Sequence, residues 1–195
     1  TPRYLISFLR CHMFELDLTP FPTLRTERLV LRAITAEDAP ALFRIRSDAQ
    51  IMKHIGRPIA TQMEEVEQLI ERILNDLREN NGISWAITLH GDDIMLGTIG
   101  YYRLKKEHYR GEVGYALHSD HWRQGIMHEA LEAVVACGFE RLGFHSIEAI
   151  TDPRNEASNA LLLRCGFTRE GLFKEDFFWN GEFLDSAVYS RLAPV

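Results

Sequence analysis

The stretch from Ile83 to His118 carries a strand-like alternation of side chains that the preceding segment lacks. Three runs within it, "ISWAITLH", "IMLGTIGYYRL" and "GEVGYALH", alternate apolar and polar residues and are separated by "GDD" and by a polar break. Alternation with period two is typical of strands, and short polar breaks join antiparallel neighbours. The sequence therefore predicts a three-stranded antiparallel meander.

The segments around this meander alternate between helical and strand patterns. Strands are predicted at 28–34 and 146–151, and in a final hairpin that turns at Asn180 and Gly181. Helices are predicted at 35–48, at 61–80, from the residues after 125 to about 142, and at 155–165. The resulting order, βααβββαβαββ, defines an α/β (α+β) fold with a mixed sheet of about seven strands and helices on both faces.

Composition limits the class of protein. A chain of 195 residues that is 46% hydrophobic and 26% charged can bury the core of one globular domain, which we expect at 26–195 after a lead-in at 1–25. Residues 1–12, ahead of Met13, are expected to be an expression addition or to lie upstream of the natural start. A net charge of −6 argues against nucleic acid as a partner and mildly favours cationic partners.

The cysteines indicate the compartment. Cys11, Cys137 and Cys165 are too few and too scattered for a disulfide framework, and they form no CxxC pair. This usage predicts a reducing cytoplasm. The apolar run at 4–9 is too short to span a bilayer, so no membrane association is expected. The oligomeric state stays open between a monomer and a homodimer.

One loop, "SDHWRQG" at 119–125, leads from a predicted strand into a predicted helix. The first amides of a helix lack intrahelical partners and lie at the positive end of its dipole, so they bind anions. Gly125 would let a phosphate oxygen approach without meeting a Cβ, although a lone glycine before a helix is more often a tight turn. The loop lacks the lysine of GxxxxGK[ST] and the three glycines of a dinucleotide fingerprint. Both interpretations of the loop therefore stay open.

A second motif, "NEASNALLLRCGF" at 155–167, joins this loop in a pattern that resembles the GNAT superfamily of acetyl-CoA-dependent N-acetyltransferases. The family's loop motif is [QR]xxGx[GA], in which Trp122 takes the first position here and Met127 the last. With a tryptophan at its first position, the loop resembles that of the ribosomal-protein (RimJ/RimL-type) branch. Further matches to that branch are "TERLVLR" at 26–32, "GEVGYALH" at 111–118 and "WNGEFLDSAVYSRL" at 179–192. The resemblance implies a GNAT-like fold whose fourth and fifth strands splay apart.

The resemblance also implies a cofactor site. The strand at Tyr115, Ala116 and Leu117 would pair with the pantetheine arm, which behaves as an added strand. Asn155 and Asn159 would hydrogen-bond that arm from the other side, unless they serve only for N-capping and solvation. The pyrophosphate of acetyl-CoA would lie on the backbone amides of Arg123, Gln124, Gly125, Ile126, Met127 and His128. The Met127 side chain would either crowd the pyrophosphate or point into the core.

Acetyl transfer to an amine needs a neutral nucleophile and a group that stabilises the leaving thiolate. By resemblance, Ser158 would lie near the thiolate and Glu112 would take the amine proton. The alternatives are a local helix cap for Ser158 and a solvent-facing or ion-paired position for Glu112. Cys165 is expected to pack rather than to form an acyl-enzyme. His128 begins an HExxH pattern that Glu132 breaks, so no metal is expected.

The sequence therefore predicts a direct acetyl transfer from acetyl-CoA to a primary amine, with a protein N-terminal α-amine as the favoured acceptor. We expect the acceptor to enter between the loop at 51–59 and the last hairpin. One alternative is a small-molecule amine, such as an antibiotic or a polyamine. Another is a non-catalytic CoA-binding sensor or interaction module, which Met127 would support. A phosphate-loop nucleotide hydrolase ranks last because its lysine is missing.

Overall fold

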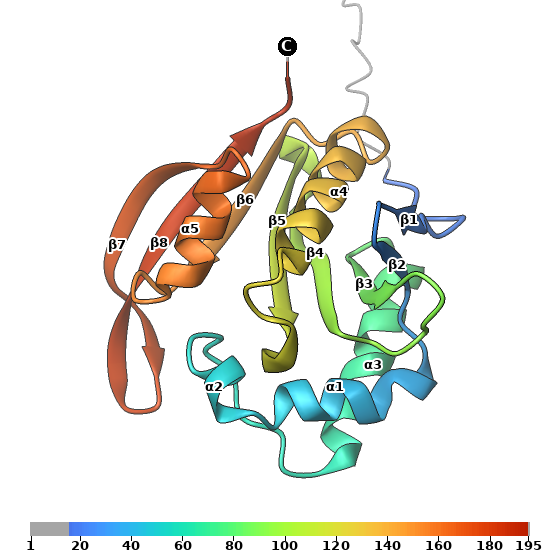
Figure 1. Cartoon of the computed structure of the whole chain (residues 1–195). Coiled ribbons are helices and arrows are strands. Elements are labelled where there is room, and N and C mark those ends of the chain that lie inside the picture. Colours follow the sequence, from blue (N-terminus) through green and yellow to red (C-terminus); the bar gives the residue numbers. More distant parts are fainter. Residues whose placement is uncertain (1–15, 195) are drawn as a thin grey trace, which may run out of the picture.

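The computed structural model describes residues 16–194 and contains one eight-stranded sheet, ordered β1-β2-β3-β4-β5-β6-β8-β7 (Figure 1). The strands are β1 (Leu24–Arg25), β2 (Leu29–Ala33), β3 (Ile83–Leu89), β4 (Gly97–Lys105), β5 (Arg110–Leu117), β6 (Ser146–Thr151), β7 (Thr168–Trp179) and β8 (Glu182–Leu192). The predicted meander is confirmed, because β3, β4 and β5 pair antiparallel in sequence order. The expectations for residues 1–12 and for Cys11 lie outside the described residues.

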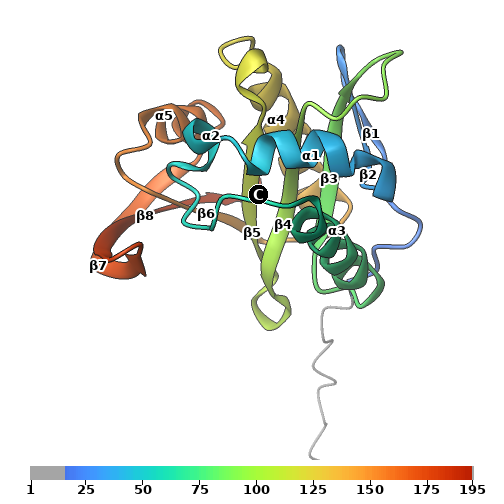
Figure 2. The ribbon, with the colours of Figure 1, turned by 90° about the horizontal axis from the view of Figure 1, so that it is seen from below.

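Helices cover both faces of the sheet, as predicted. They are α1 (Ala39–Arg46), α2 (Ala49–Met52), α3 (Met63–Arg78), α4 (Ile126–Glu140) and α5 (Glu156–Arg164). Figure 2 shows α4 and α5 on one face and α3 on the other, while α1 and α2 cross the end of the sheet. Helix α2 was not predicted and overlaps the first two residues of the loop predicted at 51–59, because a helix of one turn has no apolar period to detect. The Asp48 side chain caps it by accepting hydrogen bonds from the backbone of Gln50 and Ile51.

The apolar stripes of the helices form the core with the sheet. Val66 and Ile70 of α3 are buried on one side, and α4 buries Ala130, Leu131, Val134 and Val135 on the other. Apolar residues at three- and four-residue spacing lie on one helical face, which explains this pattern. The predicted lead-in also contributes, since Leu16 and Leu18 are buried in the main core cluster. The sheet has one strand more than the seven predicted. The additional strand, β1, belongs to the same lead-in and is too short to give a sequence signal.

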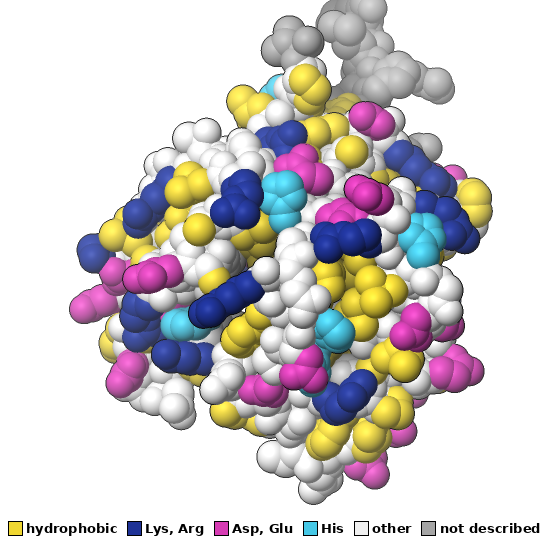
Figure 3. Space-filling view, in the orientation of Figure 1, with side chains coloured by type: hydrophobic (Ala, Val, Ile, Leu, Met, Phe, Trp, Pro, Cys, Tyr) yellow, Lys and Arg dark blue, Asp and Glu magenta, His cyan; other side chains and the backbone are white. Residues whose placement is uncertain are grey.

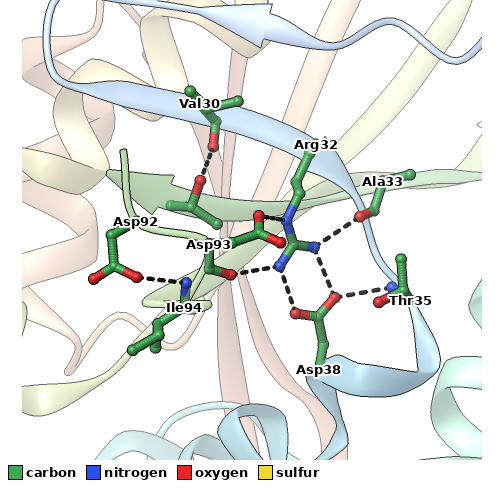
Figure 4. A network of polar contacts seen from close by, with 9 residues as sticks. Val30, Arg32, Ala33, Thr35, Asp38, Asp92, Asp93 and Ile94 are labelled. Atoms are coloured by element: carbon green, nitrogen blue, oxygen red, sulfur yellow. Dashed lines mark hydrogen bonds and ion pairs between the residues drawn. The ribbon is translucent and has the colours of Figure 1, made fainter. Parts of the chain in front are cut away.

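A charged network fixes the turn from β2 into α1. Arg32 donates two hydrogen bonds to the carboxylate of Asp38, at 2.8 and 2.7 Å, and a third to the backbone oxygen of Asp93 (Figure 4). The Asp38 carboxylate also accepts from the backbone N–H of Thr35 at 2.8 Å. Asp38 is 4% exposed, so its ion pair with Arg32 is buried. This network holds the end of the sheet that α1 covers.

The two central strands β5 and β6 separate part-way along their length. They run parallel and pair only where Arg110–Glu112 faces Ser146–Glu148. Beyond that register β5 continues to Leu117 and β6 to Thr151 without facing each other. Because β1 was not predicted, β5 and β6 are the fourth and fifth predicted strands. Their predicted splay is therefore confirmed. It leaves a gap between the strands, with the loop before α4 on one side and the start of α5 on the other (Figure 1).

Candidate active site

The loop before α4 presents backbone donors to the gap. Gly125 is the N-cap of α4 and has φ +77°, and Arg123 also has a positive φ of 59°. The hydrogen bond that closes the first turn runs from the Glu129 N–H to the Gly125 oxygen at 3.1 Å. The N–H groups of residues 126–128 therefore have no intrahelical acceptor. Met127, whose side chain the sequence left in two possible places, packs against the main core cluster, so it does not crowd these donors.

The edge of β5 offers alternate peptide groups to the gap. The His118 N–H bonds to Leu96 on the β4 side at 2.9 Å, and a Cβ built on Gly97 of β4 would lie 2.5 Å from the Ala116 oxygen. Because successive peptide groups of a strand point in opposite directions, those of Tyr115 and Leu117 face the gap while Ala116 faces β4. The Leu117 oxygen already accepts a hydrogen bond from the Trp122 indole at 2.8 Å. Of the three predicted residues, Tyr115 and Leu117 suit an added strand.

Two hydroxyl groups meet across the gap. The Tyr115 OH and the Ser158 Oγ lie 2.8 Å apart, joining β5 to α5. Burial raises the pKa of Tyr115 to about 12, against the opposing effect of the Ser158 hydrogen bond. The phenol therefore stays protonated at neutral pH and keeps a proton to share. The Tyr115 side chain was not among the sequence candidates, which included only its backbone, because nothing in "GEVGYALH" indicates what faces a tyrosine on this strand.

The two asparagines of α5 have different local partners. Asn155 is the N-cap, and its Oδ1 accepts from the Ser158 N–H at 3.2 Å, so the expected N-cap role is present. Asn159 was expected either to bind the cofactor or to be solvated. Its Oδ1 instead accepts from the Thr151 hydroxyl at 2.6 Å and its Nδ2 donates to the Pro153 oxygen at 3.0 Å. Asn159 thus joins β6 to α5, and Asn155 is the better placed of the two to offer its amide to a ligand.

Glu112 lies where the β5–β6 ladder ends. Its carboxylate is 14% exposed and accepts two hydrogen bonds from Arg103 Nη1, both at 3.1 Å. Burial raises the pKa of Glu112 above its ordinary value, and the Arg103 charge opposes that shift. A carboxylate whose pKa lies nearer neutrality is a better proton acceptor for an ammonium group. Glu112 is ion-paired, as one sequence alternative had it, and remains a candidate base.

Cys165 lies in a cluster that does not favour a thiolate. It is 1% exposed, and burial raises the pKa of its thiol to about 12, with further help from Glu132. The thiol therefore keeps its proton at neutral pH. The Cys165 Sγ and one ligand atom each of His128 and Glu132 all lie within 4.8 Å of one another. All three residue types can bind metals. The Glu132 carboxylate already pairs with Arg191 at 3.1 Å, and the Cys165 thiol keeps its proton. Both features disfavour a metal cation in this cluster.

The loop after α2 meets the last hairpin. A Cβ built on Gly56 would lie 2.6 Å from the Phe177 ring, so the two segments between which the acceptor was expected to enter are in contact at this point. His54 Nδ1 lies 2.9 Å from Asp152, the residue after β6. A cavity there is lined by Lys53, His54 and Arg154, and Figure 3 shows basic side chains gathered in this region. Arg154 also pairs with the Asp152 carboxylate at 2.7 Å, so Lys53 is the basic side chain of this cavity for which no ion pair is found within residues 16–194.

A gap between splayed parallel strands, bordered by free helix-start amides, fits a ligand that is both anionic and extended. The amides suit a pyrophosphate, and the open edge of β5 suits an amide-containing chain. The hydroxyl pair lies beyond the last β5–β6 residue pair, and Glu112 lies at that pair with its side chain on the opposite face of the sheet. Together these features define a transferase of the class that takes an acyl group from coenzyme A.

Comparisons with known proteins agree with this class. The family model for the acetyltransferase (GNAT) domain matches residues 28–168, and the chain belongs to that family. YoaA of Bacillus subtilis, an uncharacterized N-acetyltransferase, is 37% identical over 89% of this chain and 98% of its own length. The ribosomal-protein-serine acetyltransferase of Escherichia coli is 24% identical over 86% of this chain and 94% of its own. RimL, a ribosomal α-N-protein acetyltransferase solved with coenzyme A, matches with a TM-score of 0.80 at 24% identity, covering 92% and 98% of the two chains.

The protein is thus an N-acetyltransferase that uses acetyl-CoA, and the RimJ/RimL-type resemblance is confirmed. This excludes the non-catalytic sensor and the nucleotide hydrolase. Within residues 16–194, no helix combines the length and apolar character needed to cross a membrane.

Proposed function

We propose that the protein acetylates the N-terminal α-amine of a protein by direct transfer in the gap between β5 and β6. The observation that carries this proposal is the juxtaposition of three elements at the gap. These are the amides of the loop before α4, the Tyr115–Ser158 hydroxyl pair and Glu112. Each supplies one requirement of amide formation: cofactor binding, stabilisation of the leaving group, and proton acceptance.

The chain's residues would act in a defined order. Acetyl-CoA supplies the acetyl group as a thioester. The amides of residues 123–128 would bind its pyrophosphate, and the peptide groups of Tyr115 and Leu117 would align the pantetheine arm. The Glu112 carboxylate takes a proton from the acceptor ammonium, directly or through water. The neutral amine nitrogen then bonds to the acetyl carbon as the carbon–sulfur bond breaks, and the second proton that the nitrogen loses ends on the sulfur, which leaves as a thiol. The Ser158 hydroxyl, accepting from the Tyr115 phenol, would donate a hydrogen bond to the sulfur that leaves with the electron pair.

The surface near the gap suits a polypeptide acceptor. Phe173, Phe178 and Phe183 on the β7–β8 hairpin are 58%, 59% and 64% exposed, which provides apolar surface for a bound chain. Lys53 in the nearby cavity would repel a polyamine and attract a carboxylate, whereas the Arg154 charge is already paired with Asp152. The net charge of −6 of the whole chain favoured cationic acceptors, but it does not determine the local charge at this cavity. A peptide with a free amine and acidic residues close behind it fits both features.

A panel of acceptors tests this function. The protein would be incubated with acetyl-CoA and one of four acceptors: a peptide with acidic residues after its free N-terminus, the same peptide with lysines there, the N-terminally blocked acidic peptide, or spermidine. Mass spectrometry should show one acetyl group on the free acidic peptide, less on the lysine peptide and none on the blocked one. Acetylation of spermidine alone would replace a protein acceptor with a small amine.

The cellular location belongs to the same proposal. Cys137 and Cys165 are free and buried, and we propose a reducing cytoplasm, in which such thiols persist.

A further inference from the structure

The segment before β2 reaches across to the first turn of α4. The Thr26 hydroxyl and the Arg28 N–H both donate to Glu129 Oε1, at 2.5 and 2.9 Å. The Arg28 side chain adds a bond from Nε to Glu129 Oε2 at 2.7 Å. These contacts join residues about a hundred positions apart. The segment at 26–28 thus anchors the helix that carries the loop.

The remaining part of the Arg28 guanidinium lies over the loop itself. Nη1 donates to the Gln124 oxygen at 3.0 Å, and Nη2 lies 3.3 Å from the place where a Cβ on Gly125 would be. Within residues 16–194 no acceptor is found for Nη2. The Arg28 side chain is 46% exposed and lines a cavity together with Gly125 and His128. The group closest to the missing Cβ of Gly125 is therefore a guanidinium with unused donors.

Arg28 also compensates the negative charge of Glu129 next to the loop. Glu129 lies in the first turn of α4, where it stabilises the helix but would repel an anion on the loop amides. Burial tends to raise the pKa of Glu129, but the hydrogen bonds from Thr26 and Arg28 lower it below its ordinary value, so the carboxylate is ionised at neutral pH. Arg28 neutralises that charge by direct contact. Its removal would leave an unpaired carboxylate beside the pyrophosphate site.

We propose that Arg28 is a cofactor-positioning residue: it fixes the loop through Gln124 and Glu129, and it offers Nη2 to the pyrophosphate of acetyl-CoA. This inference rests on the proposed placement of the pyrophosphate on the loop amides. Arginine suits the task because its planar fork can bind Glu129, Gln124 and an anion from separate edges. Lysine would keep the charge but could not bridge all three.

The test compares two ligands and three variants. Affinities for acetyl-CoA and for S-acetyl-pantetheine, which lacks the pyrophosphate, would be measured by thermal-shift titration for the wild type, Arg28→Gln, Arg28→Lys and Arg25→Gln. Arg25 is a matched control, because it is an exposed arginine on the neighbouring strand β1. Arg28→Gln should lose about 10- to 100-fold in acetyl-CoA affinity, the range for charge-assisted hydrogen bonds. Arg28→Lys should lose less, and Arg25→Gln should match the wild type.

The pantetheine ligand separates positioning from a general effect on the fold. Its affinity should be the same in the wild type and in both Arg28 variants. An equal loss for both ligands would mean that Arg28 merely supports the gap, and unchanged acetyl-CoA affinity in Arg28→Gln would also overturn the inference. If Arg28→Gln does not fold, Arg28→Lys decides by the same comparison. A wild type whose acetyl-CoA affinity is no higher than its acetyl-pantetheine affinity would instead refute the proposed placement of the pyrophosphate.

Discussion

The Tyr115 hydroxyl of β5 and the Ser158 hydroxyl of α5 lie 2.8 Å apart across the point where β5 and β6 have separated. The sheet no longer joins these two elements there, so the hydroxyl pair replaces a backbone ladder as their connection. While the pair stays hydrogen-bonded, one hydroxyl donates to the other, and the proton of the second can be donated to a sulfur atom in the gap. The pair therefore both connects β5 to α5 and supplies a hydrogen-bond donor to the gap.

Removing either hydroxyl should slow turnover more than it weakens cofactor binding. We expect Ser158→Ala and Tyr115→Phe each to lower kcat by about 10-fold or more, as for donors to developing charge, with little change in the KM for acetyl-CoA. Because the two groups act as a pair, the double variant should lose less than the product of the single losses. Steady-state kinetics with the acidic peptide checks this. A wild-type kcat in Ser158→Ala would remove Ser158 from the chemistry.

The charge of Arg103 should set the pH at which Glu112 works. The base is active when deprotonated, so kcat/KM rises with pH through the Glu112 pKa, which burial raises and Arg103 lowers. Arg103→Gln removes the lowering influence and should move the rise to higher pH, whereas Arg103→Lys should leave it nearly in place. Glu112→Gln should cost about 100-fold in kcat/KM, the lower range for loss of a general base. Identical pH profiles for the wild type and Arg103→Gln would contradict this role.

Gly125 should be more sensitive to a side chain than a glycine of the same backbone conformation elsewhere. Gly125→Ala meets both a φ of +77° and the Arg28 guanidinium 3.3 Å away. Gly91 has φ +78° with nothing within 4 Å of its added Cβ, so Gly91→Ala experiences the backbone strain alone. Both variants should lose about 1 kcal/mol of unfolding free energy. Only Gly125→Ala should also lose acetyl-CoA affinity, by roughly 10-fold, the equivalent of one hydrogen bond; equal affinities would exclude a close approach at this loop.

Cys165 should be dispensable for the transfer. Its pKa of about 12 and its burial leave almost no thiolate, so an acyl-enzyme on this sulfur is not expected. Cys165→Ala should keep kcat within about 2-fold of the wild type, although loss of buried volume will lower the free energy of unfolding by about 1 kcal/mol. Cys137→Ala, at the other buried thiol, is the control. Intact-protein mass spectrometry that finds acetyl on Cys165 during turnover would require a covalent route.

The sequence predicted the parts of the fold that depend on local periodicity. The meander, the long helices and the turn at Asn180–Gly181 all follow from apolar spacing or turn chemistry within a few residues. The strand β1 and the helix α2 were missed because two and four residues carry no period. The loop donors could be predicted for the same local reason, since helix-start amides are free in any helix.

What could not be predicted depends on contacts between distant segments. The Arg28–Glu129 and Tyr115–Ser158 contacts join positions 101 and 43 residues apart, and no local pattern specifies them. The direction of the Ala116 peptide follows from the register of β5 against β4, which one residue of slip would reverse. Lys53, His54 and Arg154 come to one cavity through folding alone, because a net charge does not locate individual charges.

The central claim is that acetyl-CoA lies in the gap with its pyrophosphate on the loop amides and its pantetheine arm along β5. Amide nitrogen–proton NMR spectra of the labelled protein, recorded with and without acetyl-CoA, test this most directly. The account predicts large shifts for the amides of residues 123–128 and for Tyr115 and Leu117, with a much smaller shift for Ala116, whose peptide group faces β4. Shifts confined to other parts of the sheet, with residues 123–128 unchanged, would contradict it.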